Sequence, residues 1–209
     1  MRWNCHVKVL DNIGFGSVSR TMSGLEFILA DYTRRNEEAG GNFPAVVSIS
    51  LWFTPSDIMD AALQDLFDAG LLITASAGNK GLVSCSQSPA RAPASISVMS
   101  SGSDNVLAAN SNFGDCADII APGVEVRSTY ITGDDSHATF SGTSMACPHV
   151  AGVLLRYMTQ AIAETGKKPT PSEARTWLFD NATKDAINLR GRPDTKNLFV
   201  YAPCDLMSL

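Results

Sequence analysis

The stretch FSGTSMACPHVAGV, residues 140–153, gives the strongest structural signal in this sequence. Gly142 and Thr143 precede Ser144 where a helical pattern begins, and Pro148 lies near the start of that pattern, where proline disturbs a helix least. The first N–H groups of a helix have no partner within it and attract negative charge. Ser144 therefore combines an exposed hydroxyl with a free N–H, which suits an oxyanion. The alternative is that Thr143 or Ser144 simply caps the helix.

The stretch opens one of several helices that alternate with short apolar runs. Helical spacing of apolar residues predicts helices over residues 19–38, around residues 58–69 before Gly70, and from Ser144 to Ala161. Thr170, Pro171 and Glu173 have the spacing of a capping box, with Trp177 and Leu178 facing inward. Strands are predicted over residues 6–10, 45–50, 71–77, 95–100 and 118–121. Several are apolar on both faces, so the pattern indicates an α/β fold with a buried parallel sheet.

Composition limits the classes of protein. The chain has 209 residues, 44% of them hydrophobic, which is enough for one sizeable core, so we expect a single domain over residues 1–209. The net charge of −5 comes without a basic run, which argues against a nucleic-acid partner. No apolar window approaches the roughly 18 residues of a membrane span. The five cysteines include no C-x-x-C pair, which argues against a zinc site.

Several motifs together resemble the subtilisin-like serine peptidases. GTSMACPHVAG resembles the nucleophile motif of that family, and ASAGNKG, residues 75–81, resembles its oxyanion segment. VKVLDNIGFGSVSRTMSGLEFI looks like the family's strand, glycine-bearing substrate loop and helix, and VVSISL like the central strand that ends in the substrate cleft. SPARAPASISVMS, NSNFGDCADIIAPGV and NLFVYAP look like later landmarks of the family, and the SPARAP match and the ending favour its proteinase K and aqualysin branch. The resemblance runs from Val7 to Pro203. It implies a three-layer fold in which helices flank a parallel sheet, here without its N-terminal strands.

The resemblance implies a serine endopeptidase acting on polypeptides. Ser144 would be the nucleophile, and its N–H and the Asn79 side-chain amide would hold the oxyanion. Taken alone, Asn79 would be an ordinary turn residue before Lys80 and Gly81, and the GTSMA stretch downstream is what favours the functional interpretation. The residues expected to bind substrate are Gly14, Phe15, Gly16, Ser50, Leu51, Trp52, Ala77 and Gly78. Trp52 and Phe53 stand where many relatives have glycines, so they either narrow the cleft or are core aromatics at a strand end.

The catalytic base is missing from the sequence. The family places its aspartate and histidine in D-[ST]-G and H-G-T-H motifs upstream of the segment that VKVL resembles, and the sequence contains neither motif. His149 lies about 7.5 Å along the helix from Ser144, His137 is expected in a loop, and His6 at a strand edge. The sequence therefore predicts part of a catalytic domain, poorly active alone, which needs a missing N-terminal segment or propeptide as partner.

The resemblance also implies two stabilising sites, although no cofactor is required. Asp118 matches the carboxylate of a structural calcium site that the carbonyls of Pro93 and Ser95 would complete, and its alternative is a role at a strand start. Cys85 and Cys116 stand where aqualysin-like enzymes carry a disulfide, and their alternative is two buried thiols. Cys147 is expected to be reduced, and Cys5 and Cys204 have no evident partners.

Two other functions compete with the endopeptidase. A non-catalytic relative would keep the peptide cleft as a binding or regulatory module. A nucleotide-binding domain is suggested by Gly14-x-Gly16 after a strand, but Ser19 stands where the third glycine is required. The chain itself carries no visible address, and the family resemblance implies a secreted protein.

Overall fold

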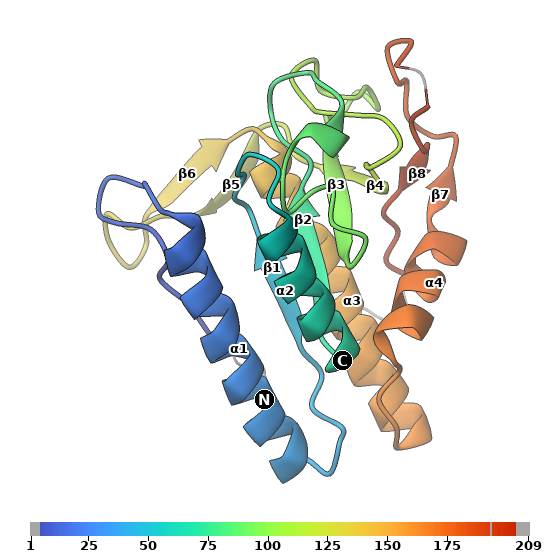
Figure 1. Ribbon diagram of the computed structural model, residues 1–209. Coiled ribbons are helices and arrows are strands. Elements are labelled where there is room, and N and C mark those ends of the chain that lie inside the picture. Colours follow the sequence, from blue (N-terminus) through green and yellow to red (C-terminus); the bar gives the residue numbers. More distant parts are fainter. Residues whose placement is uncertain (1–4, 193, 204–209) are drawn as a thin grey trace.

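The computed structural model describes residues 5–192 and 194–203 and has an α/β architecture (Figure 1). A six-stranded sheet has the order β1-β2-β3-β4-β8-β7, and β5 and β6 form a separate antiparallel pair. The neighbours from β1 to β4 and on to β8 are parallel, whereas β7 is antiparallel to β8. The strands are β1 (Val46–Ile49), β2 (Leu72–Ser76), β3 (Ser95–Ser101), β4 (Ile119–Pro122), β5 (Val126–Thr129), β6 (His137–Phe140), β7 (Thr183–Lys184) and β8 (Leu198–Phe199).

Helices cover both faces of the sheet and give three layers. The helices are α1 (Val18–Glu38), α2 (Asp57–Asp68), α3 (Thr143–Thr165) and α4 (Pro171–Asn181), with a short 3₁₀ turn at Ser84–Ser86. One buried cluster joins the sheet to α3 and α4, and a second joins its other face to α1 and α2. Figure 1 shows α2 in front of the sheet and α3 behind it. Because α3 contacts β1, β2, β3 and β4, it is the central support of the fold.

Local hydrogen bonds explain where the helices begin and end. The hydroxyls of Ser17 and Ser56 accept backbone N–H groups at the starts of α1 and α2. Thr170 and Glu173 form the predicted capping box of α4, behind Pro171. At the end of α2, Gly70 takes φ 107°, and the Leu71 N–H bonds the Leu66 carbonyl. This left-handed glycine closure matches the predicted helix end.

The structure differs from the predicted elements at residues 6–10 and at His137. Residues 6–10 form no strand, although Val7 and Val9 both pack against Gly24 of α1, where an added Cβ would lie 3.3 and 2.6 Å from their methyl groups. A strand needs a hydrogen-bonded neighbour, and the described residues supply none for this segment. His137 was expected in a loop, but it begins β6 and is paired with Thr129 of β5.

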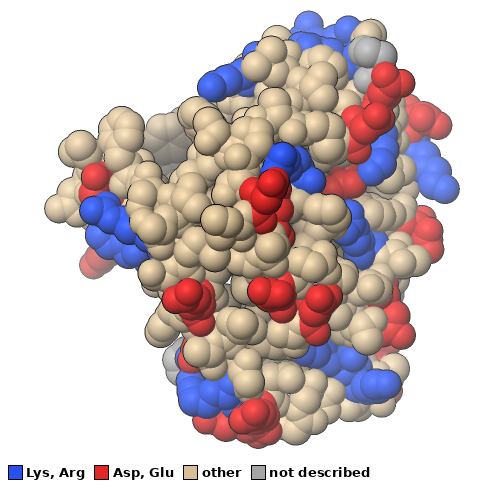
Figure 2. Space-filling model, viewed as in Figure 1, with Lys and Arg blue, Asp and Glu red and all other residues tan. Residues whose placement is uncertain are grey.

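The outer surface carries both signs of charge. Figure 2 shows Lys and Arg side chains interspersed with Asp and Glu over the face in view. Among the described residues, no helix is both long enough and apolar enough to cross a membrane.

The central position of α3 predicts that truncating a buried leucine of this helix lowers the free energy of unfolding far more than truncating an exposed leucine elsewhere. Leu154 is fully buried between α3 and the sheet, whereas 53% of the Leu82 side chain is exposed. We expect Leu154→Ala to lower the free energy of unfolding by about 2–5 kcal/mol. The matched variant Leu82→Ala is expected to change it by less than about 0.5 kcal/mol. Urea unfolding followed by circular dichroism measures both, and equal losses would contradict this account of the core.

Candidate active site

The site lies at the amino end of α3, beside the carboxyl ends of β1 and β2. Gly142 is the N-cap residue and its N–H bonds the Gly123 carbonyl at 2.7 Å. Ser144, the second residue of α3, is partly buried. Neither Thr143 nor Ser144 caps the helix, because both already lie inside it, so the alternative prediction of a simple capping serine was wrong. The Ser144 N–H precedes the first intrahelical bond and is available to a ligand.

Asn79 is held in place by Thr143. The Asn79 Oδ1 accepts hydrogen bonds from the Thr143 N–H at 2.8 Å and from the Thr143 hydroxyl at 3.0 Å. The Thr143 Oγ1 in turn accepts the Gly78 N–H at 3.1 Å. Because Oδ1 is committed to Thr143, the amide NH₂ group of this exposed residue is free to donate outward. Thr143 thus fixes Asn79 at the start of α3, next to Ser144 in the sequence, and this contact is one that sequence reasoning missed.

Pro148 explains a further contact at the site. It lies within α3 and not at its first position, so it removes the N–H that would otherwise bond the Ser144 carbonyl four residues earlier. The Ser50 hydroxyl donates to that carbonyl at 2.9 Å. This bond ties the backbone of the candidate nucleophile to the residue that follows β1. A proline four residues after the serine was the sequence signal for such a donor.

No described histidine reaches the Ser144 hydroxyl. The His149 ring bonds the Met145 carbonyl through Nδ1 at 2.9 Å and is exposed. His137 lies in β6 and His6 lies near the amino end of the described chain, and both are exposed. Within the described residues, the Ser144 hydroxyl has no hydrogen-bond partner, and no histidine bonds it.

The other predicted substrate residues fall into three groups. Ala77 and Gly78 are buried, and the Ala77 carbonyl accepts the Gln87 side-chain amide at 2.8 Å. The Trp52 side chain is 54% exposed and lies under the Lys80 ammonium group, 4.0 Å from its ring centre. Gly14, Ser50 and Leu51 line a groove beside β1. Phe15 and Gly16, which follow Gly14 in the chain, are exposed.

The two aromatics that replace glycines therefore differ. Phe53 packs against the cluster under α1 and α2 and its backbone pairs with Ser88, as the core interpretation predicts. Trp52 instead remains at the surface, where its contact with Lys80 bridges the segment after β1 and the oxyanion segment.

Two of the three predicted calcium residues contact positively charged side chains. The Asp118 carboxylate lies 2.7 Å from the Lys196 ammonium group, and the Pro93 carbonyl accepts a hydrogen bond from Arg175 at 2.5 Å. Ser95 is buried at the start of β3, and its N–H bonds the Ala92 carbonyl. Two side-chain cations therefore stand where a metal ion would have to bind, and these residues do not fit a calcium site.

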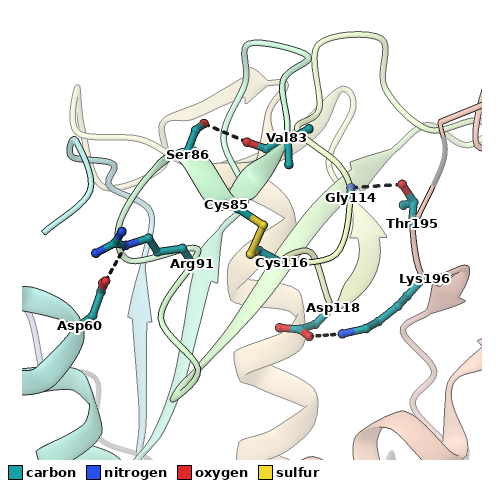
Figure 3. The surroundings of a disulfide bond; sticks show 10 residues. All are labelled: Asp60, Val83, Cys85, Ser86, Arg91, Gly114, Cys116, Asp118, Thr195 and Lys196. Atoms are coloured by element: carbon teal, nitrogen blue, oxygen red, sulfur yellow. Dashed lines mark hydrogen bonds and ion pairs between the residues drawn. A yellow bond between two sulfur atoms is a disulfide. The ribbon is translucent and has the colours of Figure 1, made fainter. Parts of the chain in front are cut away.

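The cysteines differ in their chemical state. Cys85 and Cys116 form a disulfide with Cα atoms 5.1 Å apart (Figure 3). Cys147 is a free, buried thiol in α3, three residues after Ser144, with hydrogen-bond contacts to Thr74 and Ser48. Cys5 is free and exposed, and Cys204 lies outside the described residues.

Comparison with known proteins places this geometry in a family. The family model described as Subtilase family matches residues 15–201. The chain belongs to the subtilase family. The crystal structure of a cold-adapted subtilisin-like serine proteinase aligns with a TM-score of 0.81 and 31% identity, covering 94% of this chain and 65% of that chain. The α/β fold predicted from the sequence is thereby confirmed.

Curated relatives of this subtilase are named as proteinases. It is 34% identical to an extracellular serine proteinase of Thermus sp. and 37% identical to a cuticle-degrading serine protease of Arthrobotrys oligospora. The alignments cover 94% and 90% of this chain but only 44% of each relative. Cerevisin of Saccharomyces cerevisiae is 34% identical over 93% of the chain and 32% of its own length. The subtilase chain thus spans less than half the length of these relatives.

The Cys147 thiol should be unreactive in the folded subtilase. Burial raises the pKa of this thiol above its ordinary value, so it stays protonated at neutral pH, and reagents that need a thiolate are excluded. We expect iodoacetamide at pH 7.5 to modify Cys5 while Cys147 reacts only after unfolding.

The raised pKa of the Cys147 thiol also affects stability. Above about pH 8.5 this thiol ionises in the unfolded chain but not in the folded one, so its contribution lowers the free energy of unfolding as pH rises.

Peptide mapping by mass spectrometry distinguishes the two thiols, with a Cys147→Ala variant as the control for assignment. Equal modification rates of Cys5 and Cys147 in the folded protein would contradict the buried position of α3 residue 147.

Proposed function

We propose that this subtilase is part of a serine endopeptidase in which Ser144 is the nucleophile. The observation that carries the proposal is the fixed Asn79 amide beside Ser144, with Oδ1 bound to Thr143 and NH₂ turned outward. N–H donors from Asn79 and from Ser144 itself, at the amino end of a helix, match the requirements of an oxyanion site. The names of the relatives support the same activity.

The reaction divides into steps with named groups. The Ser144 oxygen attacks the carbonyl carbon of a peptide bond, and the electron pair displaced onto the carbonyl oxygen is held by the Ser144 N–H and the Asn79 amide. Collapse of this intermediate expels the amine and leaves an acyl group on Ser144, which water then removes. In the first step a base takes the Ser144 proton and passes it to the departing amine, and in the second it takes a proton from water and returns one to the Ser144 oxygen as the acid is released. In this proposal a histidine outside the chain performs these transfers.

A polypeptide segment outside the 209 residues would supply that histidine and its aspartate, and the groove beside β1 is the place for it. The groove has a volume of about 1250 Å³ and lies between residues 5–12, α1 and β1, with Pro148, Ala151, Gly152 and Leu155 of α3 as its floor. β1 is an edge strand, so its backbone on the groove side is unpaired among the described residues. Residues 6–10 face the same groove and are also unpaired.

The groove sets requirements for its occupant. An added strand would be buried between α1 on one face and α3 on the other, so it has to be apolar on both. β1 to β4 are mutually parallel, and a strand that continues this pattern would end at the same edge as Ser50 and Ser144. Residues that follow it would therefore reach the nucleophile. The part of the relatives that this chain does not span is the occupant we propose.

The protein is further proposed to act outside the cell. One relative is named an extracellular proteinase, and the disulfide between Cys85 and Cys116 needs an oxidising environment to persist.

Labelling of Ser144 by a fluorophosphonate tests the catalytic proposal. We expect weak labelling of the chain alone and strong labelling when it is co-expressed with the N-terminal part of the catalytic domain of the Thermus relative, because that part would bring the base. Ser144→Ala is expected to abolish labelling. Asn79→Ala is expected to slow peptide hydrolysis by about 10²–10³-fold, the magnitude known for the oxyanion asparagine of subtilisin itself.

Rapid labelling of the bare chain would contradict the need for a base from outside it. A complex that forms but leaves Ser144 unlabelled would instead favour the non-catalytic relative that binds peptides.

A substitution at Gly152 tests the groove independently of activity. Gly152 lines the groove floor, and a Cβ added there meets nothing within 4 Å, so larger side chains fit without disturbing the fold. Gly152→Phe is expected to fill the groove and reduce co-purification with the Thermus segment at least tenfold. Gly152→Ala is the matched control and should co-purify as the wild type does. Equal capture by the Phe and Ala variants would place the partner elsewhere.

A further inference from the structure

Asp118 lies among positive groups from two other parts of the chain. Its carboxylate side chain is 9% exposed, and Oδ1 lies 2.7 Å from the Lys196 ammonium group (Figure 3). Oδ2 accepts the Ser97 N–H at 3.0 Å and lies 3.7 Å from the Arg175 guanidinium. Both carboxylate oxygens therefore already have partners.

Arg175 connects this carboxylate to a backbone carbonyl. Its Nη1 donates to the Pro93 oxygen at 2.5 Å while its Nη2 faces Asp118. The guanidinium also lies over the Phe179 ring, 5.6 Å from its centre, one turn further along α4. A carboxylate and a carbonyl are the oxygen ligands that Ca²⁺ prefers. Here the planar guanidinium of Arg175 contacts both of these groups.

We propose that Arg175 and Lys196 occupy the cation position between Asp118 and the Pro93 carbonyl, so that this subtilase is locked there by side-chain cations and not by calcium. Together the two side chains carry the charge of one divalent ion. They also link separate parts of the chain, as a bound ion would. Arg175 belongs to α4 and Lys196 to the segment before β8, whereas Pro93 precedes β3 and Asp118 precedes β4.

The neighbouring contacts make displacement of these cations unfavourable. The segment that carries Lys196 is anchored again where the Gly114 N–H bonds the Thr195 hydroxyl at 3.1 Å. The disulfide at Cys116 fixes the chain two residues before Asp118 (Figure 3). An incoming metal ion would have to break the Lys196 ion pair and the Arg175 hydrogen bond and remain beside two positive charges. The inference is independent of the endopeptidase proposal, because it concerns stability alone.

Thermal unfolding with calcium or with EDTA tests the inference. We expect the Tm of the wild-type chain to agree within about 1 °C in the two conditions. The double variant Arg175→Gln with Lys196→Gln removes both cations and leaves the oxygens, so it should gain a calcium response. At a calcium concentration one hundred times the dissociation constant, its Tm should rise by about 5–10 °C.

Adding Asp118→Asn to the double variant is the matched control, because it removes the carboxylate and should abolish the response. A wild-type Tm that rises with calcium and loses this rise in Asp118→Asn would overturn the inference. So would a folded double variant without any calcium response. Should the double variant not fold, calcium binding to the wild-type chain and to Lys196→Gln, measured by equilibrium dialysis, decides the question, with binding to the wild-type chain contradicting the inference.

Discussion

The hydrogen bonds between Asn79 and Thr143 join the two halves of the site. They fix the loop after β2 to the first residue of α3, and they also decide which face of the Asn79 amide is presented to solvent. Since α3 contacts four strands, this junction is supported by the whole core. The Ser50 hydroxyl adds a third element by bonding the carbonyl that Pro148 leaves open. The geometry around Ser144 is therefore tied to the packing of α3.

The site residues that a local pattern identifies were the ones predictable from the sequence. The GTSMA stretch marks the start of α3, and the capping box of α4 has a fixed spacing. The contacts that the prediction missed join distant positions. Lys196 and Asp118 are 78 residues apart, and Arg175 and Pro93 are 82 apart, so no spacing rule connects them. The calcium prediction considered the oxygens of Asp118 and Pro93 without the two side-chain cations that contact them in the structure.

The predicted strand over residues 6–10 illustrates another limit. Its alternating valines do pack against Gly24, as a strand's would, but a strand also depends on a neighbour. Hydrophobic pattern predicts which side chains are buried, whereas pairing depends on the rest of the sheet. The hairpin of β5 and β6 is the opposite case, because its strands are paired although their exposed residues give no apolar signal.

The open side of β1 has a consequence for handling the protein. An unpaired strand edge next to an apolar groove accepts any extended chain, including another copy of the same protein. Self-association through this edge would compete with binding of the proposed strand, and the competition would grow with protein concentration. The same surface would then govern both the solubility of the 209-residue chain and the assembly of the proposed site.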